Sequence, residues 1–177
     1  NARRSCASSF TRIRSNSTCI TNARATLLSW SIEEASAADA EGIADVYLAS
    51  RFLPGTHSDI ETRAWIAEQL IPLCRVWVTR AERCIVGFLA LRADSIEQLH
   101  VLPRFQRQGL GTALLAKART ASPDRLTLFT FQANTRARAF YERHGFRAVD
   151  FNDGERNEEK TPDVRYEWSA PEARLTP

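Results

Sequence analysis

A glycine-containing turn between a strand-like and a helix-like segment offers the clearest chemistry in this sequence. Residues Gln106 to Thr112 read Gln-Arg-Gln-Gly-Leu-Gly-Thr, and Pro103 breaks the apolar strand pattern just before them. Glycines at the start of a helix expose backbone N–H groups where the helix dipole is positive. Arg104 and Arg107 add full positive charges beside the turn. This arrangement predicts a site for a phosphate or pyrophosphate group.

The glycine spacing excludes two better-known phosphate loops. Leu114 stands where the third glycine of a dinucleotide-binding fingerprint would be, and no Gly-Lys-Ser or Gly-Lys-Thr follows the turn. The first difference argues against a Rossmann dinucleotide site, and the second argues against a Walker A loop. By itself, the segment Gly109-Leu110-Gly111 is also compatible with a tight turn that only packs a strand against a helix.

A second segment with chemical groups at regular positions runs from Asn134 to Phe146. Asn134 can cap a helix through its side-chain oxygen, and Gly145 suits the position just after a helix end. Between them lies Tyr141, next to Phe140. A phenol has an ordinary pKa of about 10, so at neutral pH it is protonated and able to donate a proton. The competing interpretation of Tyr141 is a core aromatic residue.

The elements that must position these residues follow from hydrophobic periodicity. The expected strands cover 27–32, 75–80, 84–91, 95–101, 125–131, 146–151 and 164–168, and the expected helices cover 36–51, 58–72, 109–121 and 134–144. The spacing Ser58-x-x-Glu61 is a capping box that begins the second helix, and Pro72 is expected to stop that helix. This order predicts an α/β fold with a mixed sheet and helices on both faces.

The composition is that of an ordinary globular protein with one domain. The 177 residues are 44% hydrophobic and 25% charged, which suffices for one core. Residues 1–28 hold five of the 24 basic residues and no acidic one, so the rest of the chain carries 19 basic against 21 acidic residues. We expect residues 1–26 to be an Arg- and Ser-rich extension that is disordered, a transit peptide or a cloning remnant. Residues 27–170 are expected to form a single catalytic domain, followed by a tail, 171–177.

Several classes of partner are not expected. No apolar run is long enough to cross a bilayer, which argues against a membrane protein. The arginine-rich segment contains one aromatic residue, Phe10, so it lacks the stacking surface of a nucleic-acid-binding protein. The four cysteines form no Cys-x-x-Cys pair and no cluster with histidine, so we expect no metal. Cys74 and Cys84 are expected to be small buried residues rather than a disulfide, which favours a reduced, cytoplasmic protein.

Taken together, the two motifs resemble the GNAT superfamily of acetyl-CoA-dependent N-acetyltransferases. The resemblance covers Ile85 to Phe146 and rests on the Gln-x-x-Gly-x-Gly turn, the strand in front of it and the Phe-Tyr-Glu-x-x-Gly-Phe helix end. It implies a mixed, mostly antiparallel, splayed central sheet of about seven strands flanked by about four helices. It also implies an N-acetyltransferase domain that moves an acetyl group directly from the CoA thioester to a primary amine. The stretch from Asp153 to Trp168 resembles a signature of uncharacterised bacterial members, which assigns no acceptor.

By this resemblance, backbone amides from Gln106 to Thr112 hold the pyrophosphate of acetyl-CoA. The fourth strand is expected to part from the next one, usually at a bulge, so that Leu99 and Val101 offer backbone groups to the pantetheine arm. The Leu99 N–H is expected to polarise the thioester carbonyl, as an oxyanion hole does. The residues implied in cofactor binding are Leu99, His100, Val101, Gln106, Arg107, Gln108, Gly109, Leu110, Gly111, Thr112, Asn134 and Phe140.

The implied catalytic residues are a general acid and a general base. Tyr141 is the implied acid for the departing CoA thiolate, because a phenol with an ordinary pKa of about 10 is protonated at neutral pH and can donate to a thiolate whose conjugate acid has an ordinary pKa of about 8.5. Glu97 is the expected base. It lies two residues before Leu99 on one strand, so alternation predicts that their side chains share a face. The competing interpretation of Glu97 is an edge-strand residue that faces solvent.

Two histidines and a phenylalanine complete the expected site. His57, on the loop between the first two helices, is the alternative base, because the ordinary pKa of histidine suits the task. A lone loop histidine is also a common surface residue. His100 is expected to face away from Glu97 by strand alternation. The acceptor amine is expected to contact His57 and Phe131.

The acceptor amine itself stays open between small molecules and peptides. The segment 152–163 is rich in Asp and Glu, which favours a cationic amine, although such charges often only face solvent. The alternative function is a non-catalytic module that senses acyl-CoA, and the presence of Tyr141 argues against it. Val164, Tyr166 and Trp168 alternate on one face of the last strand, and this face could serve a homodimer as easily as the core.

Overall fold

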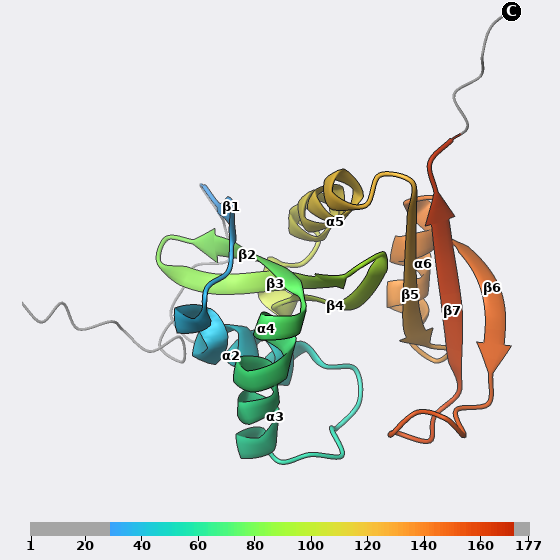
Figure 1. Cartoon of the computed structure of the whole chain (residues 1–177), viewed down its shortest axis with the longest axis horizontal. Helices are drawn as coiled ribbons and strands as arrows, with labels where there is room; N and C mark the ends of the chain where they lie inside the picture. Colours follow the sequence, from blue (N-terminus) through green and yellow to red (C-terminus); the bar gives the residue numbers. More distant parts are fainter. Residues whose placement is uncertain (1–28, 172–177) are drawn as a thin grey trace, which may run out of the picture.

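Seven strands build the central sheet in the order β1-β2-β3-β4-β5-β7-β6 (Figure 1). They are β1 (Ser31–Glu34), β2 (Arg75–Ala81), β3 (Cys84–Arg92), β4 (Ser95–Val101), β5 (Arg125–Phe131), β6 (Arg147–Asn152) and β7 (Asp163–Ser169). Every neighbouring pair is antiparallel except β4 and β5, which are parallel. The computed structural model describes residues 29–171, so the expected extension 1–26 lies outside it, as does the chain after residue 171.

Four helical units flank this sheet, as expected. They are α2 (Ala40–Ser50), a continuous helix made of α3 (Asp59–Trp65), a π-helical stretch (Ile66–Leu70) and α4 (Ile71–Leu73), then α5 (Leu110–Ala121) and α6 (Thr135–Arg143). Single 3-10 turns at Ala37–Asp39 and Pro103–Phe105 precede α2 and α5. The expected mixed α/β architecture is confirmed.

The second helix begins as expected but ends differently. Ser58 accepts from the Glu61 N–H, and the Glu61 carboxylate accepts from the Ser58 N–H over 2.8 Å, which completes the capping box. Pro72, expected to stop the helix, lies inside its last turn instead. The turn before the proline is widened, and the Ile71 N–H bonds the Ile66 carbonyl. This wider turn accommodates a residue that has no N–H to donate.

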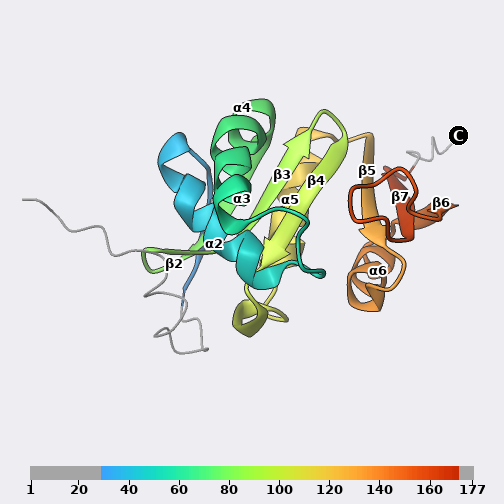
Figure 2. The ribbon, with the colours of Figure 1, turned by 90° about the horizontal axis from the view of Figure 1, so that it is seen from below.

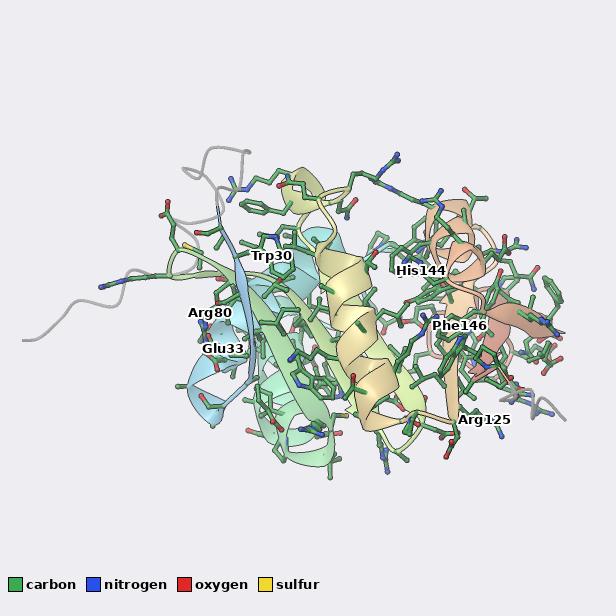
Figure 3. The ribbon with its side chains drawn as sticks, turned by 90° about the horizontal axis from the view of Figure 1, so that it is seen from above. Trp30, Glu33, Arg80, Arg125, His144 and Phe146 are labelled. Atoms are coloured by element: carbon green, nitrogen blue, oxygen red, sulfur yellow. The ribbon has the colours of Figure 1, made fainter. Side chains whose placement is uncertain are left out.

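The first strand lies slightly later than its apolar residues suggested. We expected residues 27–32, whereas β1 begins at Ser31 and ends at Glu34. Cross-strand pairing with β2 sets this position, because Glu33 of β1 forms an ion pair with Arg80 of β2 (Figure 3). The start of the expected strand, at residues 27 and 28, lies outside the described residues.

Two apolar cores lie on opposite faces of the sheet. Ile43 of α2 packs in one core with Val78 and Phe88 of the first strands. Leu114 of α5 packs in the other with Leu128 of β5. Figure 3 shows α5 crossing the strands on the near side, with α2, α3 and α4 beyond them. The second core continues under α6, so it joins the two halves of the sheet on one face.

The sheet splays between β4 and β5, and this feature creates the site. Only Ser95 and Ile96 of β4 pair with β5, after which the two strands diverge (Figure 2). A register shift against β3 leaves Glu97 as an extra residue between Ile96 and Gln98, which is a β-bulge. The expected splay beside the fourth strand and the bulge that accompanies it are therefore confirmed.

The last strand presents its alternating apolar face to the core. Val164 and Tyr166 are fully buried, and Trp168 packs against Phe146 with ring centroids 6.5 Å apart. Because the core occupies this face, the argument for a homodimer through it no longer stands.

One cysteine differs from expectation. Cys84, at the start of β3, is disulfide-bonded, whereas we expected a buried thiol there. It is only partly buried, beside the tight β2–β3 turn. Cys74 keeps a free thiol.

Candidate active site

A cleft of about 970 Å³ opens where the two halves of the sheet separate. One wall is β4 with α2 and the loop that follows it, and the other is the end of β5 with α6 and the β6–β7 loop. The turn from Pro103 to Thr112 lies along the bottom of the opening. The fold therefore brings the two sequence motifs to one cavity.

Side chains of the turn hold its backbone in shape. Gln106 donates through Nε2 to the Val101 carbonyl over 2.9 Å, and Gln108 donates through Nε2 to the Arg104 carbonyl over 3.1 Å. Arg107 has a positive φ of 64°. The two glutamines, expected to bind the cofactor, thus brace the turn with their side chains and leave its amides to a ligand.

The start of α5 presents backbone N–H groups without partners. The first intrahelical bond runs from Ala113 to the Gly109 carbonyl, so Leu110, Gly111 and Thr112 have no acceptor within the helix. No side chain caps this end. Gly109 has a φ of 86°, and a Cβ added there would meet nothing within 4 Å. The N–H groups therefore open into unfilled space, where an anion would be stabilised.

Close packing of α6 against this end depends on the second glycine. A Cβ on Gly111 would lie 3.4 Å from the ring of Phe140, so any larger side chain would push α6 away. His144, between α5 and α6 (Figure 3), joins the same two helices, since its Nε2 lies 3.0 Å from the Thr112 hydroxyl. Phe140 therefore supports the turn by packing.

The open edge of β4 carries backbone groups that no strand uses. Leu102 donates its N–H to the Val86 carbonyl of β3 over 2.9 Å. Because successive residues of a strand direct their N–H and C=O groups to opposite edges, those of Leu99 and Val101 point away from β3. On that side β5 has already diverged. The Leu99 N–H therefore lies on the edge of β4 that β5 leaves open, beside the cleft.

Tyr141 combines a buried ring with an unpaired hydroxyl. The residue is 7% exposed, and its ring packs against Phe140, Phe146 and Tyr166 with centroids 5.3, 5.5 and 6.3 Å away. It also lines the cleft. No residue within 29–171 hydrogen-bonds its hydroxyl, which is not among the polar atoms sealed from solvent. Burial alone raises the pKa of Tyr141 well above its ordinary value. The structure therefore confirms Tyr141 as a core aromatic residue, and its role as an acid stays a prediction.

Comparison with known proteins decides the family. The acetyltransferase (GNAT) family profile matches residues 41–146, more than half of the chain, and includes both motifs. The chain belongs to this family. A peptidyl-lysine N-acetyltransferase, YjaB of Salmonella typhimurium LT2, is 30% identical over 106 residues, which cover 56% of this chain and 72% of that protein. The GNAT chain described here is accordingly an acyltransferase of the N-acetyltransferase type.

Solved GNAT structures share the fold. The solution structure of apo YjaB from Escherichia coli is similar with a TM-score of 0.65 at 19% identity, over 81% of this chain and 100% of that one. The PaiA N-acetyltransferase of Thermoplasma acidophilum, solved in complex with coenzyme A, gives 0.63 at 20% identity, again over 81% and 100%. At these identities the likeness supports the GNAT fold, including its splayed sheet, and no residue role.

The expected base, Glu97, lies in the cleft on a different face from the one predicted. Its side chain is exposed, and the bulge interrupts the alternation that was to place it beside Leu99. Leu99 packs toward α5, whereas the charge of Glu97 acts on Cys74 beside α4, where burial and this charge raise the thiol pKa. The expectation that Glu97 and Leu99 share a face is therefore wrong.

The two histidines discussed as bases are placed differently. His57 does not line the cleft. It is exposed, and its Nε2 lies 3.0 Å from Glu158 Oε2 on the β6–β7 loop. His100 lines the cleft wall, with Nδ1 2.9 Å from the Ser50 hydroxyl and its ring stacked on Phe88. Burial lowers the pKa of His100 to about 4. Its imidazole is neutral at pH 7 and joins α2 to β4.

Asn134 and Phe131, the other residues expected at the site, both line the cleft. Asn134 caps α6, accepting from the Ala137 N–H over 3.1 Å, and it lines the cleft. Phe131, at the end of β5, lines the cleft and stacks on Phe52 of the α2–α3 loop with centroids 6.1 Å apart. This contact joins the two walls directly.

Sequence reasoning missed several residues of the cleft. Arg136 and Arg143 of α6 line it together with Arg107, and no carboxylate among residues 29–171 forms an ion pair with any of the three. Their spacing of seven on one helix was a usable signal, because residues seven apart share a helix face. Tyr47 of α2 and Glu159 of the β6–β7 loop also line the cleft, and only the fold brings these two distant residues to one cavity.

The described part of the chain shows neither a metal-binding cluster nor a membrane-spanning helix. Within residues 29–171 no three or more His, Cys, Asp or Glu side chains are grouped to hold a metal ion. Over the same residues no helix has the length and apolar character needed to cross a membrane.

Proposed function

We propose that this GNAT protein transfers an acetyl group from acetyl-CoA directly to a primary amine. The single observation that carries the proposal is the open edge of β4, where the Leu99 N–H faces a cleft shared with the α5 amides and the Tyr141 hydroxyl. One cavity thus contains an anion site, a strand edge and an acid. Along acetyl-CoA, the anion site would bind the pyrophosphate, the strand edge would bind the pantetheine arm, and the acid would protonate the sulfur.

Donor binding would use charge at one end and backbone at the other. The amides of Leu110, Gly111 and Thr112 would hold the pyrophosphate, with Arg136 and Arg143 supplying positive charge nearby. The pantetheine arm would lie along β4 as an added strand and hydrogen-bond Leu99. Such backbone contacts recognise an extended amide chain without requiring any particular side chain.

The chemistry is a single displacement through a tetrahedral intermediate. The amine nitrogen attacks the thioester carbonyl carbon, and the Leu99 N–H stabilises the oxygen that becomes negative. The carbon–sulfur bond then breaks, and the sulfur takes a proton from Tyr141. The amine loses its proton to Glu97 or to water, and the tyrosinate regains one from solvent. Burial keeps Tyr141 protonated beforehand and also keeps the departing thiolate poorly solvated, which makes the thiolate more basic.

A covalent acyl-enzyme is not required. No cysteine of the described residues lines the cleft. Much of the rate gain would come from holding donor and acceptor together. Since acetyl-CoA is made and used inside cells, we also propose a cytoplasmic site of action.

The acceptor named by the relative is a useful first substrate. The Salmonella protein is described as acting on peptidyl lysine, so a lysine side chain is the first amine to test here. The alternative, a non-catalytic acyl-CoA sensor, would keep the anion site and release no CoA with any amine.

Calorimetric titration with acetyl-CoA, CoA and desulfo-CoA tests the donor site. We expect wild type to bind and Gly109→Glu to lose binding, because a carboxylate would occupy the anion site. Gly109→Ala separates backbone strain from charge, since the positive φ alone costs about 1 kcal/mol of stability. Ala116→Glu adds the same carboxylate to the exposed middle of α5 and should bind normally.

The outcomes separate the two functions. Binding by wild type and Ala116→Glu, with none by Gly109→Glu, supports the donor assignment. A thiol-release assay with lysine peptides and simple amines then distinguishes a transferase from a sensor. If neither acetyl-CoA nor CoA binds wild type at millimolar concentration, the proposal is wrong.

A further inference from the structure

The end of the cleft beside the β6–β7 loop, where the acceptor amine would bind, contains an unpaired carboxylate that the transfer reaction does not use. Glu159, on the β6–β7 loop, is partly buried and lines the cleft. Its carboxylate has no hydrogen bond or ion pair with any residue in 29–171. A carboxylate that is partly buried without a partner is stabilised when a cation binds beside it.

The loop that carries Glu159 is held in a defined shape. Asn157 donates through Nδ2 to the Thr161 carbonyl over 2.7 Å and to Asp163 Oδ2 over 2.9 Å, and it accepts from the Thr161 N–H. Glu158 Oε2 lies 3.0 Å from His57 Nε2 of the α2–α3 loop. A carboxylate on such a braced loop is a fixed feature of the cavity.

Aromatic rings surround the space in front of this carboxylate. Tyr47 of α2 lines the opposite wall, its ring held by Trp65 and His100 with centroids 5.8 and 5.0 Å away. The stacked pair Phe52 and Phe131 lies beside it. The Tyr47 hydroxyl has no hydrogen-bond partner among the described residues. Aromatic walls with a carboxylate suit an alkyl chain that ends in an ammonium group.

Of the charges near Tyr47, Glu159 is the one not already paired. Burial raises the pKa of Tyr47, the charges of Glu159 and Glu158 add to the rise, and Arg51 opposes it. Arg51 Nη2 lies 4.0 Å from Asp59 Oδ1, whereas its Nη1, next to Gly55, is sealed from solvent without a hydrogen-bond partner among residues 29–171. Glu158 has its contact with His57. Glu159 is therefore the carboxylate without an ion pair at this end of the cleft, which Arg51 also lines.

This end of the cleft is separate from the place where transfer would occur. Tyr47 packs against the core on the α2 side of the sheet, whereas Tyr141 belongs to the core on the α5 side. A reacting amine must approach the thioester near Tyr141 and Leu99 as the neutral form. A cation bound at Glu159 would therefore be a second one, carried elsewhere on the same acceptor.

We propose that Glu159 and Tyr47 bind a second, non-reacting ammonium group, and that the acceptor is an aliphatic diamine or longer polyamine. The alkyl chain would lie between Tyr47, Phe52 and Phe131. This inference rests on the proposed function, since it names the substrate class of the same cleft. Tyr47 and Glu159 come from opposite walls, so the specificity site exists only in the folded protein.

Paired amines test the proposal in the thiol-release assay. We compare 1,4-diaminobutane with n-butylamine, and the three- and five-carbon pairs likewise, using the full chain at low salt. In wild type we expect kcat/KM to be at least about tenfold higher for a diamine than for its monoamine, because a partly desolvated charge pair forms only with the diamine. Added salt should weaken this preference.

Variants locate the second ammonium. In Glu159→Gln we expect the diamine preference to fall to within about twofold of unity, and in Tyr47→Phe to weaken partially. Glu155→Gln removes a carboxylate from the exposed part of the same loop and should retain the full preference. The Kd for acetyl-CoA checks that each variant is folded. Equal rates for each amine pair in wild type, or an unchanged preference in Glu159→Gln, would overturn the proposal.

A direct titration distinguishes this inference from the proposed function. If acetyl-CoA binds and no amine is acetylated, the transferase proposal fails while the cation site is still testable. Binding of 1,4-diaminobutane to the CoA-saturated protein is then followed by NMR. Weaker binding to Glu159→Gln than to Glu155→Gln supports the site, and equal binding to both refutes it.

Discussion

At the scale of single residues, the hydroxyl of Tyr141 has two neighbours that matter, an aromatic core behind it and a cleft in front. The core raises its pKa, so the proton stays on the oxygen throughout the physiological range. The same ring stabilises the fold. The catalytic role proposed for Tyr141 can therefore be tested only by removing the hydroxyl and keeping the ring.

We therefore predict that Tyr141→Phe lowers kcat about 100-fold, as expected for loss of a general acid, and leaves the Kd for acetyl-CoA unchanged. Tyr166→Phe is the matched control. It removes a hydroxyl from the same aromatic cluster, one that donates to Glu142 over 2.5 Å. The control should lower thermal stability by about 1 kcal/mol and keep kcat. A less than twofold loss of kcat in Tyr141→Phe would leave the residue a packing group only.

At the scale of elements, His100 joins α2, β3 and β4, and this junction depends on a neutral imidazole. Its pKa is about 4 in the folded chain, against an ordinary value of 6.5 expected when unfolded. Between these values the unfolded state binds more protons, so stability increases with pH. The junction is therefore fully stabilising above pH 6.5 and weakens as the pH falls toward 4.

We predict that the free energy of unfolding falls by up to about 3 kcal/mol between pH 7 and pH 4 because of this residue. His100→Gln should lower stability at pH 7 and flatten the curve within that window. Chemical denaturation at half-unit pH intervals measures it. Asp39 acts in the same direction but at lower pH. Burial would raise its pKa, but hydrogen bonds from Ser36 and Arg80 keep it below 3.8. An equally steep curve in the variant would contradict this assignment to His100.

Element positions were largely predictable from local patterns, whereas the cleft surfaces were not. Alternation and turn residues located β4 and β5 at their observed bounds, because both signals are local. The bulge at Glu97 has no local signal, and it reversed the predicted relation of Glu97 to Leu99. The meeting of Tyr47 with Glu159 depends on where β5 and β7 lie relative to α2. Such long-range placement cannot be derived from one sequence.

At the scale of the whole molecule, charge divides along the cleft. Arg107, Arg136 and Arg143 line the cleft beside the proposed donor site, and Glu159 and Asp163 line it from the β6–β7 segment, with Arg51 on the α2 wall. A donor with several phosphate charges and an ammonium-bearing acceptor would each enter at the end of opposite charge. The net charge of the full chain, +3, conceals this division.

We predict that the Kd for acetyl-CoA rises with ionic strength and that Arg136→Gln or Arg143→Gln raises it about fivefold at low salt, roughly 1 kcal/mol. Each variant should also show a shallower dependence on salt than wild type. Arg83→Gln removes an exposed arginine from the β2–β3 turn, far from the cleft lining, and should match wild type. Titrations from 20 to roughly 500 mM salt measure the slopes. Identical slopes in all four proteins would mean that these arginines do not contact the donor.

The two residue pairs that join β4 to β5 have a consequence for the life of the protein in a cell. A donor bound along β4 would fill the edge that β5 leaves empty, and binding at a hundred times the Kd adds about 2.7 kcal/mol to the stability of the folded state. The fraction of molecules open to proteases would then fall about a hundredfold. Each copy would survive longer when acetyl-CoA is plentiful, so metabolic supply would govern the abundance of the enzyme as well as its rate.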